Sequence, residues 1–240
     1  MKHWKTKNSQ TITRILSGRC NCYLVSHEGK HLLIDTGRKN RWPHLIEHLN
    51  QLGVCSGSLV AIVLTHSHFD HAENVAKVKE TFPQAAIIIH KNEGDYLKRG
   101  DNPIPQGTRL FSKLIITLLA HTFVLRRIRY RPANYDMLVD DTYDLQPLGF
   151  PGYLLHTPGH SPGSLSVIVD NEVAIVGDTL FGVFPGSAYP PYAENPKIMI
   201  QSWKKLLATG CSLFLPGHGR ERSNALLQAE YKKYRTNESA

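Results

Sequence analysis

The chain has 240 residues, of which 41% are hydrophobic and 20% are charged, and this balance excludes wholesale disorder. Its longest apolar stretch, residues 114–125, is too short for a membrane-spanning helix, which needs about 20 residues. The formal net charge is +8, but residues 98–131 alone carry +7, so the basic character belongs to one segment.

The chain opens with short apolar runs separated by turn residues, which predict an antiparallel meander. These runs are residues 11–16, 22–26 and 31–34. A helix is expected over residues 43–52, because proline is favoured at a helix start and glycine, here Gly53, just past its end. Residues 59–65 are continuously apolar, as in a strand covered on both faces, and Asp70 is expected to cap the helix that follows.

The rest of the chain again alternates apolar runs with longer helical segments. Strands are expected at residues 86–89, 141–145, 152–155, 164–169, 173–176 and 213–215. The pair Asp170-Asn171 predicts a tight hairpin turn, and helices are expected over residues 197–208 and 223–235. Strands and helices in two similar halves predict an α+β fold in which two sheets pack face to face with helices outside.

The basic segment 98–131 contains a stretch of helical length, residues 110–125, that is apolar on nearly all sides and so must be covered. Three interpretations stay open: an inert insertion with a solvated basic face, a substrate lid, or a patch for nucleic acid or a membrane surface. The same stretch would also serve as a homodimer surface. A lid would be lined by Phe111, Ile115, Leu118, Leu119 and Phe123, and a patch would use Arg126, Arg127, Arg129 and Arg131.

The string His66-Ser67-His68-Phe69-Asp70-His71 directly follows the apolar run 59–65. Imidazole suits zinc and similar metals, and a loop at a strand end projects several ligands into one cavity. His66 and His68 are two residues apart and can share one metal ion. Asp70 and His71 lie on the next turn and can serve a second one.

Three further ligand-type residues follow expected strands and adjoin glycine or proline, so each lies on a sharp turn with room for a close approach. They are His160 in TPGHSPGS, Asp178 in GDTLF and His218 in PGHG. A two-metal site needs about three ligands beyond the first string, and these residues supply them.

These motifs, together with LIDTG at residues 33–37, resemble in order and spacing the metallo-β-lactamase-fold hydrolase superfamily, in particular its small glyoxalase II-like and lactonase-like members. The resemblance implies one four-layer αβ/βα sandwich over residues 1–240, with 98–131 as a basic insertion and the site at one edge. It also implies two divalent metal ions, zinc in the first place, with iron or manganese as alternatives. It assigns His66, His68 and His160 to the first metal ion, Asp70, His71 and His218 to the second, and Asp178 to both.

The chemistry expected from such a site is hydrolysis. A metal ion lowers the pKa of bound water from 15.7 to roughly 7 and so supplies a hydroxide nucleophile. Asp70 is expected to orient that nucleophile or move a proton, besides binding metal. Asp35, at the end of LID, is expected to accept a hydrogen bond from a ligand histidine and fix its orientation. The leading hypothesis is cleavage of a small-molecule ester, lactone or thioester.

Two alternatives stay open: a phosphodiesterase or nuclease that uses segment 98–131, and a lipid- or protein-docking module with structural metals. Acyl-homoserine-lactone lactonases carry a tyrosine where this chain has Phe181, and only 22 residues follow His218, too few for the glutathione-holding domain of glyoxalase II. No apolar signal segment follows the N-terminus. We therefore expect a cytoplasmic protein whose four cysteines are reduced and packed.

Overall fold

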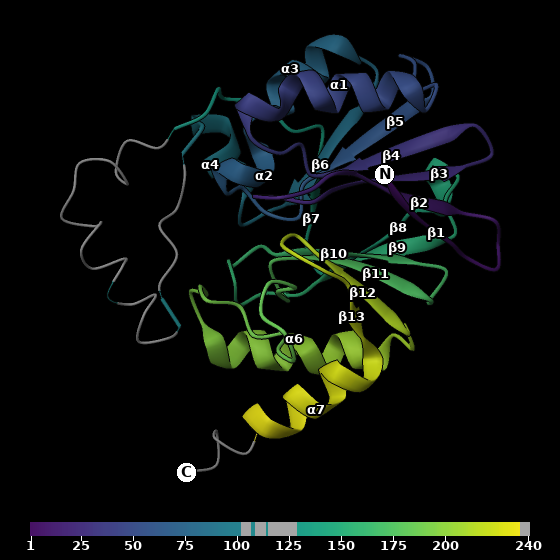
Figure 1. Cartoon of the computed structure of the whole chain (residues 1–240). Coiled ribbons are helices and arrows are strands. Elements are labelled where there is room, and N and C mark those ends of the chain that lie inside the picture. The colour runs from purple at the N-terminus through teal and green to yellow at the C-terminus, as the bar shows by residue number, and fades with distance from the viewer. Residues whose placement is uncertain (102–106, 109–113, 115–128, 236–240) are drawn as a thin grey trace.

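The computed structural model describes residues 1–101, 107–108, 114 and 129–235 of the chain. Two β-sheets face each other in the middle of the molecule, and helices cover the outer face of each sheet (Figure 1). The expected four-layer αβ/βα sandwich is therefore confirmed. The expected substrate-lid residues Phe111, Ile115, Leu119 and Phe123 lie outside the described residues, as do Leu118, Arg126 and Arg127.

The first sheet has seven strands in chain order, and it opens with the predicted antiparallel meander. The strands from β4 onward run parallel, with helices between them. The strands are β1 (Lys2–Lys5), β2 (Thr11–Leu16), β3 (Cys22–His27), β4 (Lys30–Ile34), β5 (Leu59–Val63), β6 (Ala86–His90) and β7 (Met137–Val139). The helices of this half are η1 (Lys39–Arg41), α1 (Trp42–Gln51), α2 (Phe69–Ala72), α3 (Val75–Thr81) and α4 (Gly94–Arg99).

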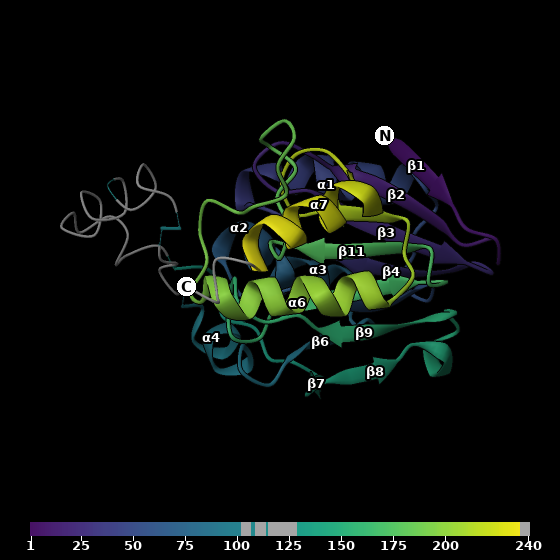
Figure 2. The same cartoon turned by 90° about the horizontal axis from the view of Figure 1, so that it is seen from below.

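The second sheet has six strands in the order β13-β12-β11-β10-β9-β8, and α6 and α7 cover its outer face (Figures 1 and 2). The strands are β8 (Thr142–Asp144), β9 (Gly152–His156), β10 (Leu165–Val169), β11 (Val173–Gly177), β12 (Leu213–Pro216) and β13 (Arg222–Ser223). The helices are η3 (Gln146–Leu148), α6 (Pro196–Ala208) and α7 (Asn224–Arg235). Asp170 and Asn171 both have φ of 54°, as the predicted tight turn between β10 and β11 requires.

The core consists of three apolar layers, because successive side chains of a strand point to opposite faces. In β4, Leu32 and Ile34 pack into the layer between the two sheets, whereas Leu33 packs toward α1 and α3. A third layer joins the second sheet to α6 through the buried Trp203. The continuously apolar β5 is buried on both faces, as the sequence predicts.

Three details differ from the sequence prediction. The sequence prediction lacks β1, β7 and β13, because these strands are short and all three lie at sheet edges. Asp70 is no helix cap: α2 begins at Phe69, after an extended His68 whose side chain makes no capping hydrogen bond. The four cysteines are free, but Cys55 is exposed and not packed. Among the described residues, no helix is both long and apolar enough to cross a membrane.

Candidate metal centre

The predicted ligand residues come together from loops at one edge of the sandwich. His66 follows β5, His160 follows β9, Asp178 follows β11 and His218 follows β12. Strands β5, β11 and β12 have parallel neighbours, so their carboxyl ends open to the same edge of their sheets. Loops far apart in the sequence therefore supply side chains to one place.

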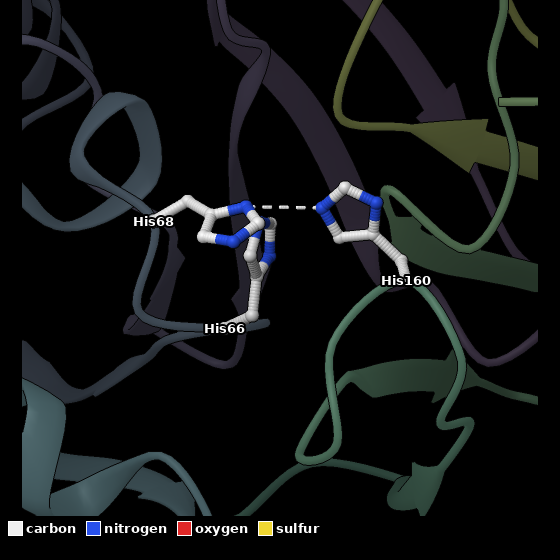
Figure 3. A group of neighbouring side chains, drawn as sticks. All are labelled: His66, His68 and His160. Carbon is white, nitrogen blue, oxygen red and sulfur yellow. Dashed lines mark hydrogen bonds between the residues drawn. The ribbon is translucent and has the colours of Figure 1, made fainter. Parts of the chain in front are cut away.

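A first group contains the three histidines that the sequence assigns to one metal ion. One ring nitrogen each of His66, His68 and His160 lies within 4.8 Å of the others, and all three residues are buried. His160 Nε2 lies 3.0 Å from His68 Nδ1, across the space between the loops after β5 and β9 (Figure 3). This arrangement offers three imidazole nitrogens to a single cation.

A second group lies beside the first and contains Asp70, His71 and His218. His218 Nε2 is 3.4 Å from Asp70 Oδ2. Asp178 stands between the two groups: its Oδ2 is 3.2 Å from His218 Nε2 and 3.6 Å from His160 Nε2, and its Oδ1 is 3.3 Å from His71 Nε2. One carboxylate can therefore reach both positions.

The residues fit divalent metal ions by their donor chemistry. Within the described part of the chain, His66 Nε2, His71 Nε2 and Asp178 Oδ1 are buried and make no hydrogen bond. Leaving buried polar atoms without a partner costs free energy, and these atoms point into the same space. Imidazole nitrogens and carboxylate oxygens are ligands for zinc, iron and manganese, so cations bound at the two groups would give these three atoms partners.

Hydrogen bonds fix the far side of two imidazoles, so that the nitrogen facing the site carries an electron pair that a cation can use. His160 Nδ1 donates to the carbonyl oxygen of Tyr192 at 2.9 Å. Thr65 Oγ1 lies 3.0 Å from His66 Nδ1 and gives its only proton to Asp35 Oδ2 at 2.8 Å, so His66 Nδ1 is the donor to Thr65. His66 Nε2 consequently carries a free electron pair.

Asp35, which is expected to orient a ligand histidine, is buried beside His71. Its Oδ2 accepts from His71 Nδ1 at 2.8 Å, and its Oδ1 accepts from the backbone N–H of Thr65 at 2.8 Å. The backbone of Asp35 has a φ of 59°, an uncommon conformation for a residue with a side chain, and its carboxylate contacts both Thr65 and His71. Asp35 thus orients His71 directly and His66 through Thr65.

Glu93 is a buried carboxylate at this site that the sequence analysis missed. Its Oε2 accepts from the backbone N–H of Ser67 at 3.1 Å and from the Ser67 hydroxyl, and its Oε1 accepts from Gly163 N–H at 3.0 Å. Ser67 lies between His66 and His68, and Gly163 belongs to the loop of His160, so Glu93 joins the two loops of the first group. The available signal was its position just after β6, at the same kind of strand end.

Gly217 lets the second group close tightly. A Cβ at this position would lie 2.4 Å from Asp178 Oδ1 and 2.7 Å from His71 Cε1, which no side chain can tolerate. The glycine of PGHG is therefore required for the approach of Asp178 to His71.

The two groups differ in charge. Burial, and then the neighbouring cationic forms of His71, His68 and His160, lower the pKa of His66 well below its usual value. Burial and His160 likewise lower the pKa of His68 to about 3. These imidazoles are therefore neutral at pH 7 and ready to donate electron pairs.

The second group favours positive charge. Burial alone would lower the pKa of His71, but the carboxylates of Asp178, Asp35 and Asp70 outweigh burial and raise it well above its usual value. Burial is outweighed in the same way at His218, where Asp178 and Asp70 raise the pKa to about 9. A metal ion that binds here has to displace protons from both histidines.

Comparisons with known proteins agree with this architecture. The family model described as Metallo-beta-lactamase superfamily matches residues 17–218. A probable metallo-hydrolase of Streptococcus pyogenes serotype M6 is 28% identical over 91% of this chain and 84% of its own length. An atrochrysone carboxyl ACP thioesterase of Aspergillus fumigatus is 24% identical over 88% of this chain and 56% of its own length. The structure of a metallo-beta-lactamase from Cronobacter sakazakii has a TM-score of 0.68 at 17% identity, covering 100% of this chain and 93% of that one.

Proposed function

The chain belongs to the metallo-beta-lactamase superfamily of metallo-hydrolases, and we propose that it hydrolyses a small ester, thioester or lactone. Membership implies divalent metal ions, and we propose two of them, most readily zinc. The observation that carries the proposal is the position of Asp178 between two groups of three ligand-type side chains. When bound, the metal ions supply an activated water and polarise the oxygen of the scissile carbonyl.

Within this proposal His66, His68 and His160 hold one ion, Asp70, His71 and His218 hold the other, and Asp178 binds both. The side chains of Asp70 and His218 are 20% and 14% exposed, whereas those of His71 and His160 are at most 2% exposed. Substrate and water therefore reach the site from the side of Asp70. Burial raises the pKa of Asp70, but His71 and His218 outweigh it and lower the pKa overall, so its carboxylate is ionised at neutral pH. It can orient water and accept a proton.

Two features support an acyl substrate. One relative is named a thioesterase, which cleaves an acyl–sulfur bond. The ring of Phe181 stacks on His218 with centroids 4.7 Å apart, so an apolar wall without a hydroxyl borders the second group. An apolar acyl chain packs favourably against such a wall.

The phosphodiesterase alternative has weaker support in the described residues. Arg129 lies 3.4 Å from Asp101, and Arg131 pairs with both carboxylate oxygens of Glu80. Each of these two arginines thus already faces a carboxylate. We therefore do not propose a nucleic-acid substrate.

A hydrolysis panel tests the proposal on metal-replete protein. It compares an acyl thioester, an acyl lactone and bis(p-nitrophenyl) phosphate, with the Asp70→Asn variant as the control. We expect the wild-type protein to hydrolyse acyl substrates. The variant should hydrolyse them more slowly by about a hundredfold or more, since a positioned acid or base contributes that much to the rate. Turnover of the phosphodiester alone, or equal turnover by the variant, would contradict the proposal.

A further inference from the structure

An arginine-lined pocket adjoins the candidate metal centre and has no role in the chemistry described so far. Its volume is about 280 Å³, and the loop between β2 and β3 and the segment before α1 form its walls. Three arginines line it, namely Arg19, Arg38 and Arg41, together with the polar side chains of Ser17 and Asn40. None of the residues that line it is acidic.

The guanidinium groups of this arginine pocket have hydrogen-bonding capacity to spare. In the described residues, Nε of Arg38 and Nε of Arg41 are buried and make no hydrogen bond. Glu73 lies 3.8 Å from Arg38 Nε, beyond hydrogen-bond distance. Arg41 also directly precedes α1, whose first turn has neither a capping side chain nor an acidic residue. The uncapped helix start and the positive charge of the three arginines around the pocket both favour a negative charge there.

The wall that carries Arg38 and Arg41 is held in place before any ligand arrives. The side-chain amide of the buried Asn74 donates to the carbonyl oxygens of Thr36, Gly37 and Arg38, at 2.8 to 3.2 Å. Glu73 accepts from the backbone N–H of Lys39 at 2.8 Å. Asn74 and Glu73 follow directly on the motif that carries His71, so the pocket and the metal centre share one rigid support.

The arginine pocket also shares a wall with the metal centre. Cys20 lines the pocket, and its Sγ lies 3.5 Å from His71 Nδ1. Gly37 lines the pocket and donates its N–H to the carbonyl oxygen of His71 at 3.2 Å. The guanidinium carbon of Arg38 lies 4.9 Å from the ring centre of Phe69, the residue between His68 and Asp70. A molecule bound in the pocket is therefore separated from His71 by the wall that Cys20 and Gly37 form.

We propose that the arginine pocket is an oxyanion-binding site and that it receives a carboxylate or phosphate group carried by the substrate. Guanidinium groups match the planar or tetrahedral oxygen arrangement of such anions. No acidic residue lines the pocket, and among its arginines Arg38 has Glu73 as an ion-pair partner outside it, at 3.8 Å. The substrate would then be an acyl compound with an anionic arm, cleaved beside the pocket. The assignment of the anion to the substrate rests on the proposed function, whereas anion binding itself does not.

Binding of sulfate to the metal-replete protein tests the site without any turnover. We compare the wild-type protein, the double variant Arg19→Gln/Arg41→Gln and a control, Lys7→Gln/Arg235→Gln, by calorimetry at low ionic strength. The control loses the same two charges at residues that do not line the pocket. We expect the arginine variant, and not the control, to bind sulfate about tenfold more weakly, because charge-assisted hydrogen bonds are lost. Equal sulfate binding by all three proteins, with equal metal contents, would overturn the proposal.

A second experiment tests whether the anion that binds in the arginine pocket is part of the substrate. Mono-4-nitrophenyl esters of the dicarboxylic acids from succinate to suberate are each compared with the neutral 4-nitrophenyl alkanoate of matching length. In the Arg19→Gln/Arg41→Gln variant, we expect the KM for at least one anionic ester to rise by about tenfold. The KM for the neutral ester of matching length should stay the same. Loss of sulfate binding without any change in this preference would support the site but overturn its assignment to the substrate. If no ester is cleaved at all, the proposed function fails while the sulfate result still decides the site.

Discussion

The carboxylate of Glu93 accepts hydrogen bonds from both the N–H and the hydroxyl of Ser67, the residue between His66 and His68. Its other oxygen holds Gly163, three residues after His160. A single buried side chain thus sets the distance between the two loops of the first ligand group.

The Glu93→Gln variant should therefore bind metal more weakly. Its amide nitrogen cannot accept a hydrogen bond, so one of the two loops loses its anchor, and the loss of such a supporting contact typically costs about 10- to 100-fold in metal affinity. Competition with a zinc chelator measures the effect.

Glu230→Gln is the matched control, because Glu230 is also buried and accepts from Ser187 and the backbone of Ala188, away from the ligand residues. Equal losses of zinc affinity in both variants would mean that Glu93 has only a general structural role.

Substitution of Gly217 by alanine should prevent metal binding at the second group. The added Cβ would lie 2.4 Å from Asp178 Oδ1 and would force Asp178 away from His71. Gly57→Ala is the control, since a Cβ at that position meets no atom within 4 Å. Metal analysis of the two purified variants should show loss in the first and none in the second. A fully loaded Gly217→Ala variant would show that Asp178 does not need this close approach.

Metal binding should release protons and strengthen as the pH rises. With no metal bound, the carboxylates of Asp178 and Asp70 outweigh burial and hold the pKa of His218 near 9, so His218 is protonated at pH 7 and has to lose its proton to become a ligand. Affinity should therefore rise from pH 7 to about pH 9 and then level off. Calorimetry in two buffers of different ionisation enthalpy counts the protons, and the His218→Ala variant should release fewer. Unchanged proton release in that variant would contradict the assignment.

The same raised pKa gives the metal-free protein a defined pH dependence of stability. Protonated His218 contributes stability that is fully present below pH 6.5, its ordinary pKa, and that is lost as the pH rises through about 9. The melting temperature of the metal-free wild-type protein should therefore fall over this interval by more than that of His218→Ala. An identical pH dependence in the two proteins would rule out this contribution of His218.

Much of the fold was predictable because most strands of the two sheets show an apolar pattern within their own residues. The buried strand β5 is a continuous apolar run, and the turn Asp170-Asn171 has its own residue signature. The polar strand β1 could not be predicted in this way, since Lys2–Lys5 lies at the edge of the first sheet and is mostly exposed. Its place is decided by pairing with β2 and not by its own composition.

The ligand-type residues of the site were also predictable, because each stands at a turn directly after an apolar run. Glu93 was not, because its partners Ser67 and Gly163 are 26 and 70 residues away in the sequence. The arginine pocket was missed for the same reason: Arg19 and Arg41 come from separate loops that only the fold brings together. Segment 98–131 dominated the charge pattern, although its described residues Arg129 and Arg131 face carboxylates.

In the proposed site, the two ligand groups hold two metal ions that Asp178 joins. Anomalous X-ray diffraction at the zinc absorption edge, on crystals of the zinc-loaded protein, tests it most directly. We predict two anomalous peaks, one among His66, His68 and His160 and one among Asp70, His71 and His218, with an oxygen of Asp178 next to each. A single peak, or two peaks away from Asp178, in a protein that still hydrolyses acyl substrates would contradict the account.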